Sequence, residues 1–168
     1  GNDLFAYFKS TASKSRNNFL RILRGAHSDY VLNAAAHQYL KAHSFPNLHF
    51  AKLPLSSASL ADTDEAWGQY LEGLEIKSFN AVKLVSEAAL LGSAIEHGLS
   101  PDLVILSDGA RQFAILTHAL CWVHRERAVR RLSGETQQQR QNLEDVQDAL
   151  WIYYRQLRAF QDEPSMEQ

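Results

Sequence analysis

The sequence predicts an α/β fold with a mixed sheet flanked by helices, and two observations carry that prediction. Short apolar runs that are typical of strands alternate along the chain with amphipathic patterns that are typical of helices. The chain has 168 residues, and its 45% hydrophobic and 21% charged residues are values of globular proteins with a buried core. We therefore expect one domain that covers residues 1–168.

The predicted strands are short runs rich in β-branched, aromatic and other apolar residues, bounded by polar or turn-forming residues. They lie at 4–8, 29–33, 81–85 and 103–106, with a possible further one at 49–53. The run Leu103-Val104-Ile105-Leu106 is continuously apolar, a pattern that favours a strand buried on both faces.

Helices are predicted where apolar residues recur every three or four positions near a capping residue. The first predicted helix lies around 19–23, after the Ser-rich turn 9–15, and ends at Gly25. The next ones lie at 34–43, after a cap at Asp62 or Thr63, and at 87–97, where Gly98 closes the helix. The remaining ones are a helix around 110–116, an Arg-rich helix after His124 and a C-terminal amphipathic helix over 143–160. The segment from Phe45 to Asp64 is rich in Pro, Ser and small residues, which indicates a connection or an inserted segment.

Bulk properties exclude little about function. A net charge of -2 gives no overall electrostatic case for nucleic-acid binding, although a local basic cluster can still supply one. One cysteine, Cys121, excludes an internal disulfide. No apolar run approaches the roughly 20 residues of a membrane helix, and the first residues lack the pattern of a signal peptide. We expect a cytoplasmic protein without membrane contact.

Asp108 is the first candidate for a functional residue. It directly follows the predicted strand 103–106, at the carboxyl end where α/β proteins place many ligand and metal sites. A carboxylate there is a suitable ligand for Mg²⁺ or Mn²⁺, and Gly109 allows a sharp turn beside it. From spacing alone, capping of the following helix is the simpler role for Asp108.

Cys121-Trp122-Val123-His124 places a thiol and an imidazole three residues apart. Such a pair is half of a zinc site, but no second cysteine and no matching histidine pair complete it. Packing of these residues at a helix start is the simpler interpretation.

The helix after His124 carries a local cluster of basic residues: Arg125, Arg127, Arg130 and Arg131. Guanidinium groups bind phosphate oxygens in bidentate geometry, so nucleic-acid contact is one interpretation. The other is a solvated helix face with internal ion pairs, in which Glu126 takes part.

The aromatic residues Trp151, Tyr153 and Tyr154 could stack on bases, but at helical spacing they are more simply core residues.

The motifs taken together resemble those of one transposase family. They are Val104-Ile105-Leu106-Ser107-Asp108-Gly109, Cys121-Trp122-Val123-His124 with the Arg-rich helix behind it, Gly1-Asn2-Asp3-Leu4-Phe5, Asp29-Tyr30-Val31-Leu32-Asn33, Leu90-Leu91-Gly92-Ser93 and Glu96-His97-Gly98. In this combination the chain resembles the bacterial insertion-sequence transposases of the DDE class, specifically the insertion-sequence-sixty-six-like group. The resemblance covers nearly the whole chain.

The resemblance implies a ribonuclease-H-like fold, here incomplete, and a catalytic centre in which three carboxylates hold two Mg²⁺ or Mn²⁺ ions for DNA cleavage and strand transfer. Asp108 matches the second of the three carboxylates. The other two positions would lie before Gly1 and beyond Gln168, so we expect an internal fragment of the catalytic domain that is inactive alone and binds no metal stably.

Other interpretations remain at this point. The chain could be a non-catalytic module that kept the fold and binds DNA or a protein through its Arg-rich helix. It could also be an unrelated α/β enzyme that uses Asp108 and His124 as acid and base. If a central strand is missing, unpaired strand edges would favour a homo-oligomer.

Overall fold

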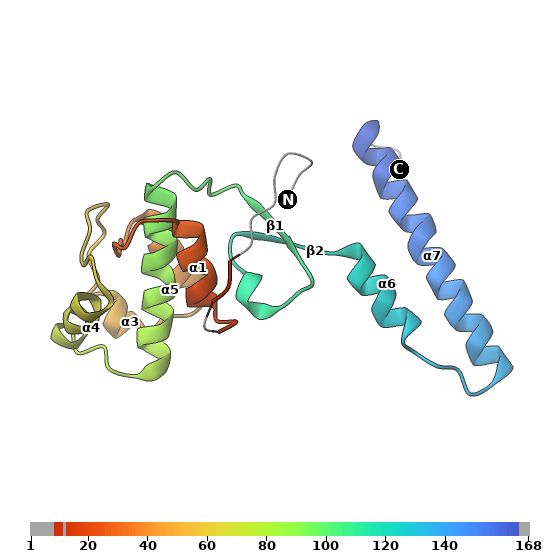
Figure 1. Ribbon diagram of the computed structural model, residues 1–168, viewed down its shortest axis with the longest axis horizontal. Helices are drawn as coiled ribbons and strands as arrows, with labels where there is room; N and C mark the ends of the chain where they lie inside the picture. The colour runs from red at the N-terminus through yellow and green to blue at the C-terminus, as the bar shows by residue number, and fades with distance from the viewer. Residues whose placement is uncertain (1–8, 12, 165–168) are drawn as a thin grey trace. The chain divides into compact units, whose positions relative to one another are not determined.

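The computed structural model describes residues 9–11 and 13–164, so the predicted strand at 4–8 lies outside the described residues. The described chain contains helices and a small sheet, and the α/β class is confirmed at this coarse level. The chain divides into two compact units (Figure 1). Unit 1 comprises Gly1–Ile105 and Ala110–His118, and unit 2 comprises Leu106–Gly109 and Ala119–Gln168.

The first five helices of the described chain lie in unit 1. They are α1 (Arg16–Arg24), α2 (Ala34–Ala42), α3 (Asn47–Phe50), α4 (Asp64–Gly73) and α5 (Phe79–Glu96). Side-chain caps start four of them: Ser15, Asn33, Thr63 and Ser78 each accept a backbone N–H of the first turn. Gly25 ends α1 at a positive φ of 76°, as its place in the sequence predicts.

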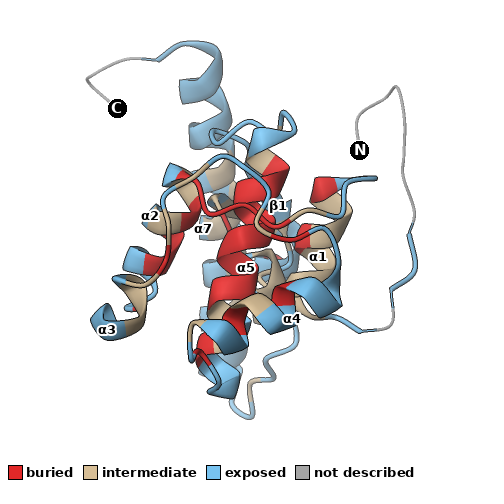
Figure 2. Ribbon diagram, turned by 90° about the vertical axis from the view of Figure 1, so that its left-hand side faces the viewer, coloured by how far each residue is buried: buried red, intermediate tan, exposed pale blue. Residues whose placement is uncertain are grey.

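Helix α5 is the centre of unit 1, and Figure 2 shows it buried along most of its length. Residues on all sides of this helix are buried, from Ala81 to Ala94, which requires partners all around it. Helices α1 and α2 both pack against it. Many of its buried side chains are small, such as Ala88, Ala89 and Ser93, and small side chains let neighbouring backbones approach closely.

The extended segment at residues 30–33 crosses α5 at close range. The Val31 N–H donates to the Ala89 carbonyl at 3.3 Å, and the Asn33 Nδ2 donates to the Gly92 carbonyl at 3.0 Å. A Cβ built on Gly92 would lie 2.2 Å from the Val31 carbonyl oxygen. Glycine at position 92 is therefore required for this crossing.

A buried ion pair connects α1, α2 and α5. The Arg16 Nη1 lies 3.2 Å from the Glu87 Oε2, and the side chain of Glu87 is only 3% exposed. The Tyr39 hydroxyl donates to the same Oε2 at 2.8 Å. Burial, followed by the Glu87 charge, raises the pKa of Tyr39, so its hydroxyl remains protonated and can donate this bond. Removal of either partner would leave an uncompensated charge between the three helices, which is strongly destabilising.

The remaining elements lie beyond α5 along the chain. Strands β1 (Val104–Ser107) and β2 (Thr117–Leu120) pair in a two-stranded parallel sheet, with a short 3₁₀ helix, η1 (Arg111–Phe113), between them. Helices α6 (Trp122–Arg130) and α7 (Gln137–Asp162) complete unit 2. Thr136 and Gln139 form a capping box at the start of α7.

Several predicted elements differ from the structure. Residues 81–85 are helical because the Ser78 cap starts α5 at Phe79, and the burial of this helix outweighs the β-branched character of the run. The described segment 29–33 forms an isolated bridge between Tyr30 and Ala61 in place of a strand. The possible strand at 49–53 overlaps α3, and the helix expected at 110–116 is reduced to η1.

The strand predicted at 103–106 is present as β1, but its expected burial on both faces is wrong. Val104 and Leu106 lie on one face of β1 and are exposed, whereas Ile105 on the other face packs against the core. Homo-oligomerisation through unpaired sheet edges stays a prediction.

Within the described part of the chain, no helix combines the length and the apolar character that a membrane crossing demands.

Substitution of Gly92 by Ala should destabilise unit 1, because the added methyl group would overlap the Val31 carbonyl. We expect a loss of about 2–3 kcal/mol in the free energy of unfolding, measured by chemical denaturation. Gly68→Ala is the matched control, since Gly68 lies inside α4 with no atom within 4 Å of the position that a Cβ would take. It should gain about 0.5–1 kcal/mol. Equal effects of the two substitutions would contradict the close crossing.

Candidate functional site

The turn after β1 carries Asp108, whose side chain is exposed. Two hydrogen bonds to Ser107 shape this turn. The Gly109 N–H donates to the Ser107 Oγ at 3.1 Å, and the Cys121 N–H donates to the Ser107 carbonyl at 2.7 Å. The second bond brings the start of α6 against the turn, so Asp108 and Cys121 lie in the same part of unit 2.

Two features of the structure require glycine at position 109. Its φ of 93° is in the region that side chains disfavour. A Cβ there would also lie 3.0 Å from the Arg125 Nη2 and 3.2 Å from the Leu120 Cδ2. The absence of a side chain therefore leaves room for the Arg125 guanidinium beside the Asp108 turn. The structure thus brings two sequence-predicted site residues, Asp108 and Arg125, to one place.

Cys121 is the N-cap residue of α6, and His124 lies in the first turn of that helix. A hydrogen bond from the His124 side chain is the largest cause that lowers the pKa of the Cys121 thiol, and the His124 backbone N–H acts in the same direction. The two residues of the predicted half zinc site are therefore engaged with each other.

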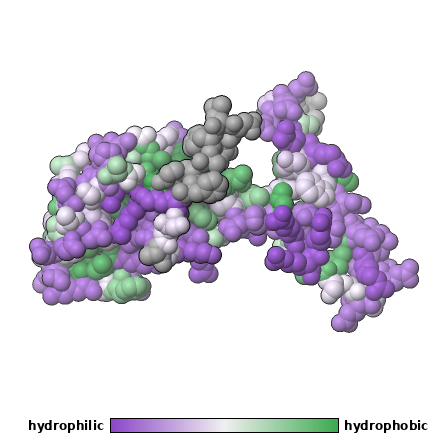
Figure 3. Space-filling model, in the orientation of Figure 1, coloured by the Kyte–Doolittle hydropathy of each residue, from purple (hydrophilic) through white to green (hydrophobic). Residues whose placement is uncertain are grey.

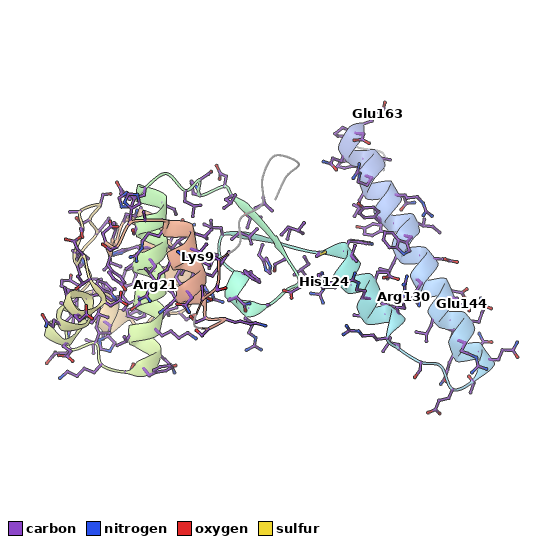
Figure 4. The ribbon with its side chains drawn as sticks, viewed as in Figure 1. Lys9, Arg21, His124, Arg130, Glu144 and Glu163 are labelled. Atoms are coloured by element: carbon purple, nitrogen blue, oxygen red, sulfur yellow. The ribbon has the colours of Figure 1, made fainter. Side chains whose placement is uncertain are left out.

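Helix α6 presents the four predicted arginines to solvent, since Arg125, Arg127, Arg130 and Arg131 are all exposed. Figure 4 shows His124 near the start of the helix and Arg130 near its end. Glu126 is buried, with a side chain that is 5% exposed, and its Oε1 lies 2.6 Å from the Arg130 Nη2. The prediction that Glu126 is an ion-pair partner inside the arginine cluster is confirmed.

Aromatic side chains hold α6 against α7. The Trp122 ring lies 5.9 Å from the Tyr153 ring and 5.6 Å from the Tyr154 ring, measured between centroids, and Trp151 meets Tyr154 edge to face. The interpretation of Trp151, Tyr153 and Tyr154 as core residues is wrong, because none of them is buried and Tyr153 is 54% exposed. The contacts explain why Trp122 belongs to the motif: it anchors the helix that carries the arginines.

The residues around Asp108 do not fit a two-metal centre. Such a centre needs several carboxylates that bridge two ions about 4 Å apart, and Glu126 is committed to Arg130. Within residues 9–11 and 13–164, the one group of three potential metal ligands is His27, Asp29 and His97, which includes neither Asp108 nor Cys121.

Sequence reasoning missed this second cluster. The His97 Nε2 lies 3.0 Å from both carboxylate oxygens of Asp29, and the His27 and His97 rings stack 3.5 Å apart. Because His97 is far from His27 and Asp29 along the chain, residue spacing carries no signal for the contact. The only hint is that segments 29–33 and 90–98 both belong to the motif combination.

Comparisons with known proteins give one informative match. The chain is 40% identical over 166 residues to the uncharacterized protein y4jO of Sinorhizobium fredii. The match covers 98% of this chain and 52% of y4jO, so the chain spans about half the length of that relative. No family model matches the chain, and no solved structure matches it.

The Cys121 thiol should react faster with iodoacetamide at neutral pH than an ordinary thiol, because its lowered pKa increases the thiolate fraction. His124→Ala removes the main cause, so the midpoint of the rate-against-pH curve should move upward. His43→Ala, at an exposed histidine of unit 1, should leave the curve unchanged. Since Cys121 is the single cysteine, the rate is assigned without ambiguity. An unshifted midpoint in His124→Ala would argue against the pairing.

Proposed function

We propose that this chain is part of the catalytic domain of a DDE-class transposase of the insertion-sequence-sixty-six-like group, and that alone it binds DNA without cutting it. The observation that carries this proposal is the placement of the Asp108 turn and the arginine-rich helix α6 in one unit, with the Arg125 guanidinium beside Gly109. A carboxylate next to phosphate-binding cations is the arrangement that a phosphodiester-processing site needs.

DNA contact through α6 is supported by the exposure and spacing of its cations. The four arginines are exposed on a helix of nine residues and on the residue that caps its end. Ser107 and Trp122 fix the start of this helix, so the arginines are presented from a positioned element. Guanidinium groups held in this way release counterions from the phosphate backbone on binding, which makes the affinity salt-dependent.

The absence of cleavage by the chain alone follows from the carboxylates. Asp108 is the one residue that matches the family's metal-binding positions, and one carboxylate alone does not supply enough ligands to hold two ions. In this proposal the longer parent protein supplies the other two carboxylates and completes the ribonuclease-H-like fold. The cofactor of that parent would be Mg²⁺ or Mn²⁺.

A second candidate function is a non-catalytic module derived from a transposase that binds DNA or a protein. Apolar side chains on the surface of unit 2 favour it, among them Val123, Ile152 and Leu157, each more than 40% exposed. Figure 3 shows hydrophobic residues among the hydrophilic ones on this unit. Val123 and Leu157 line the same surface pocket, and clustered exposed apolar residues are typical of interaction surfaces.

Replacement of Arg127 and Arg131 by glutamine should weaken binding to a random-sequence DNA duplex and make binding less salt-dependent. The slope of log affinity against log salt should fall by about one for each phosphate that the variant no longer neutralises. Fluorescence anisotropy across a salt series measures both quantities. Arg155→Gln with Arg158→Gln on α7 removes the same charge elsewhere in unit 2 and should have a smaller effect. Equal losses in both double variants would mean that net charge, and not α6, determines binding.

Supercoiled plasmid should remain intact when it is incubated with the purified chain in Mg²⁺ or Mn²⁺, and equally with the Asp108→Asn variant. Gel electrophoresis of the plasmid measures nicking. Cleavage by the wild-type chain that disappears in Asp108→Asn would show that a complete metal site assembles without the missing carboxylates. That result would overturn the proposal that the chain is inactive alone.

A further inference from the structure

We propose that His27, Asp29 and His97 form a binding site for one divalent transition metal ion of the Zn²⁺ class in unit 1. The donor atoms of the three side chains lie within 4.8 Å of one another. The site is independent of the proposed function: it involves neither Asp108 nor α6, and it would exist whether or not the chain derives from a transposase.

Two of the three ligand atoms already lie close enough together to bind one ion. The His97 Nε2 and the nearest Asp29 oxygen are 3.0 Å apart. Two ligands of a tetrahedral zinc ion, each about 2.1 Å from it, are about 3.4 Å apart, so this pair needs to separate by only a few tenths of an ångström. A metal ion between these two groups would take the place of the hydrogen bond that now joins them.

The surrounding residues hold the Asp29 carboxylate in place. The Ser93 hydroxyl donates to the Asp29 Oδ1 at 2.8 Å, and Ser93 is fully buried. The Arg24 guanidinium donates to the Asp29 backbone carbonyl at 2.7 Å, which leaves the carboxylate to Ser93 and His97. Metal-ligating carboxylates commonly have such supporting hydrogen bonds.

Backbone dipoles favour a cation at this place. His97 is the C-cap residue of α5, and His27 lies two residues beyond Gly25, the C-cap residue of α1. The C-terminal end of a helix carries partial negative charge on its unpaired carbonyls. The partial negative charges at these two helix ends therefore add to the negative charge of the Asp29 carboxylate. Together they offset the positive charge of Arg24.

His27 must turn to complete the site. Its ring is stacked on the His97 ring with an interplanar angle of 4°, whereas a metal ion lies close to the plane of each imidazole that binds it. One ion cannot lie in the planes of both rings as they stand. Residues 25–28 are exposed, so His27 has room to rotate toward the ion without disturbing the core.

The donor set selects the class of ion. Two imidazole nitrogens and one carboxylate oxygen suit Zn²⁺, Co²⁺ or Ni²⁺, whereas Mg²⁺ and Ca²⁺ prefer sites made of oxygen ligands alone. Three protein ligands leave a fourth position of a tetrahedral zinc site for water. Because two of the three donors come from exposed residues, this water would face solvent.

Isothermal titration of the tag-free chain with ZnCl₂ at pH 7.5 tests the site. We expect one ion per chain, and at least about a tenfold loss of affinity in His27→Ala, His97→Ala and Asp29→Asn. Ser93→Ala removes a supporting hydrogen bond only, and a loss of about tenfold is expected there too. Mg²⁺ should produce no heat from this site.

Two control variants distinguish this site from others. His43 is the C-cap residue of α2, as His97 is of α5, but its Nδ1 faces the Tyr39 carbonyl and no carboxylate. His43→Gln should bind Zn²⁺ as the wild type does, and so should Cys121→Ser. Absence of binding by the wild type, or loss of binding in Cys121→Ser with the His97→Ala variant unaffected, would overturn the proposal.

A measurement on the wild-type chain tests the site even if the Asp29 or His97 variants fail to fold. Histidine modification by diethyl pyrocarbonate, mapped by mass spectrometry, should be suppressed by Zn²⁺ at His27 and His97 and unchanged at His43. Equal modification of His27 and His97 with and without Zn²⁺ would exclude them as ligands.

Discussion

The crossing of the segment 29–33 over α5 determines more of unit 1 than any other contact. Because Gly92 has no side chain, the Val31 carbonyl approaches the α5 backbone closely, and this fixes the register of the segment. In that register Asn33 bonds both the Gly92 carbonyl and Glu96 while it caps α2. Asp29, four residues earlier, meets Ser93 and His97. The direction of α2 and the histidine–aspartate cluster thus share one cause, a backbone contact that only glycine permits.

In unit 2 a single residue, Ser107, also positions two functional segments. Ser107 accepts one bond from the turn after β1 and one from the start of α6, so a single residue ties the carboxylate of Asp108 to the helix with the arginines. Trp122 then anchors that helix to α7. The cluster Arg125, Arg127, Arg130 and Arg131 depends on these contacts for its position, although none of the contacts involves a charge.

Local signals made most helices predictable. Ser15 and Gly25 bound α1, Thr63 starts α4, and an apolar stripe marks α7. Prediction failed where tertiary burial decides: Ala81–Val85 has strand-like composition, but its place in a central helix overrules that preference. The position of Asp108 after a strand was predictable from the apolar run before it. The approach of Arg125 to Gly109 and the contact of His97 with Asp29 were not, because both depend on how distant segments pack.

The length of α7 has a consequence for how the chain acquires its structure. Its 26 residues contain no buried side chain, yet a capping box starts the helix. In a helix of this length the cost of nucleation is offset by many more hydrogen bonds than in a short helix. Helix α2, with nine residues, lacks that advantage and requires contacts with α5. During synthesis or refolding, α7 would therefore form from local interactions on a fast timescale, whereas unit 1 must first close loops that join residues about 60 positions apart, such as Asn33 and Gly92. The two units would then differ in folding rate and in the protection of their backbone amides from solvent exchange.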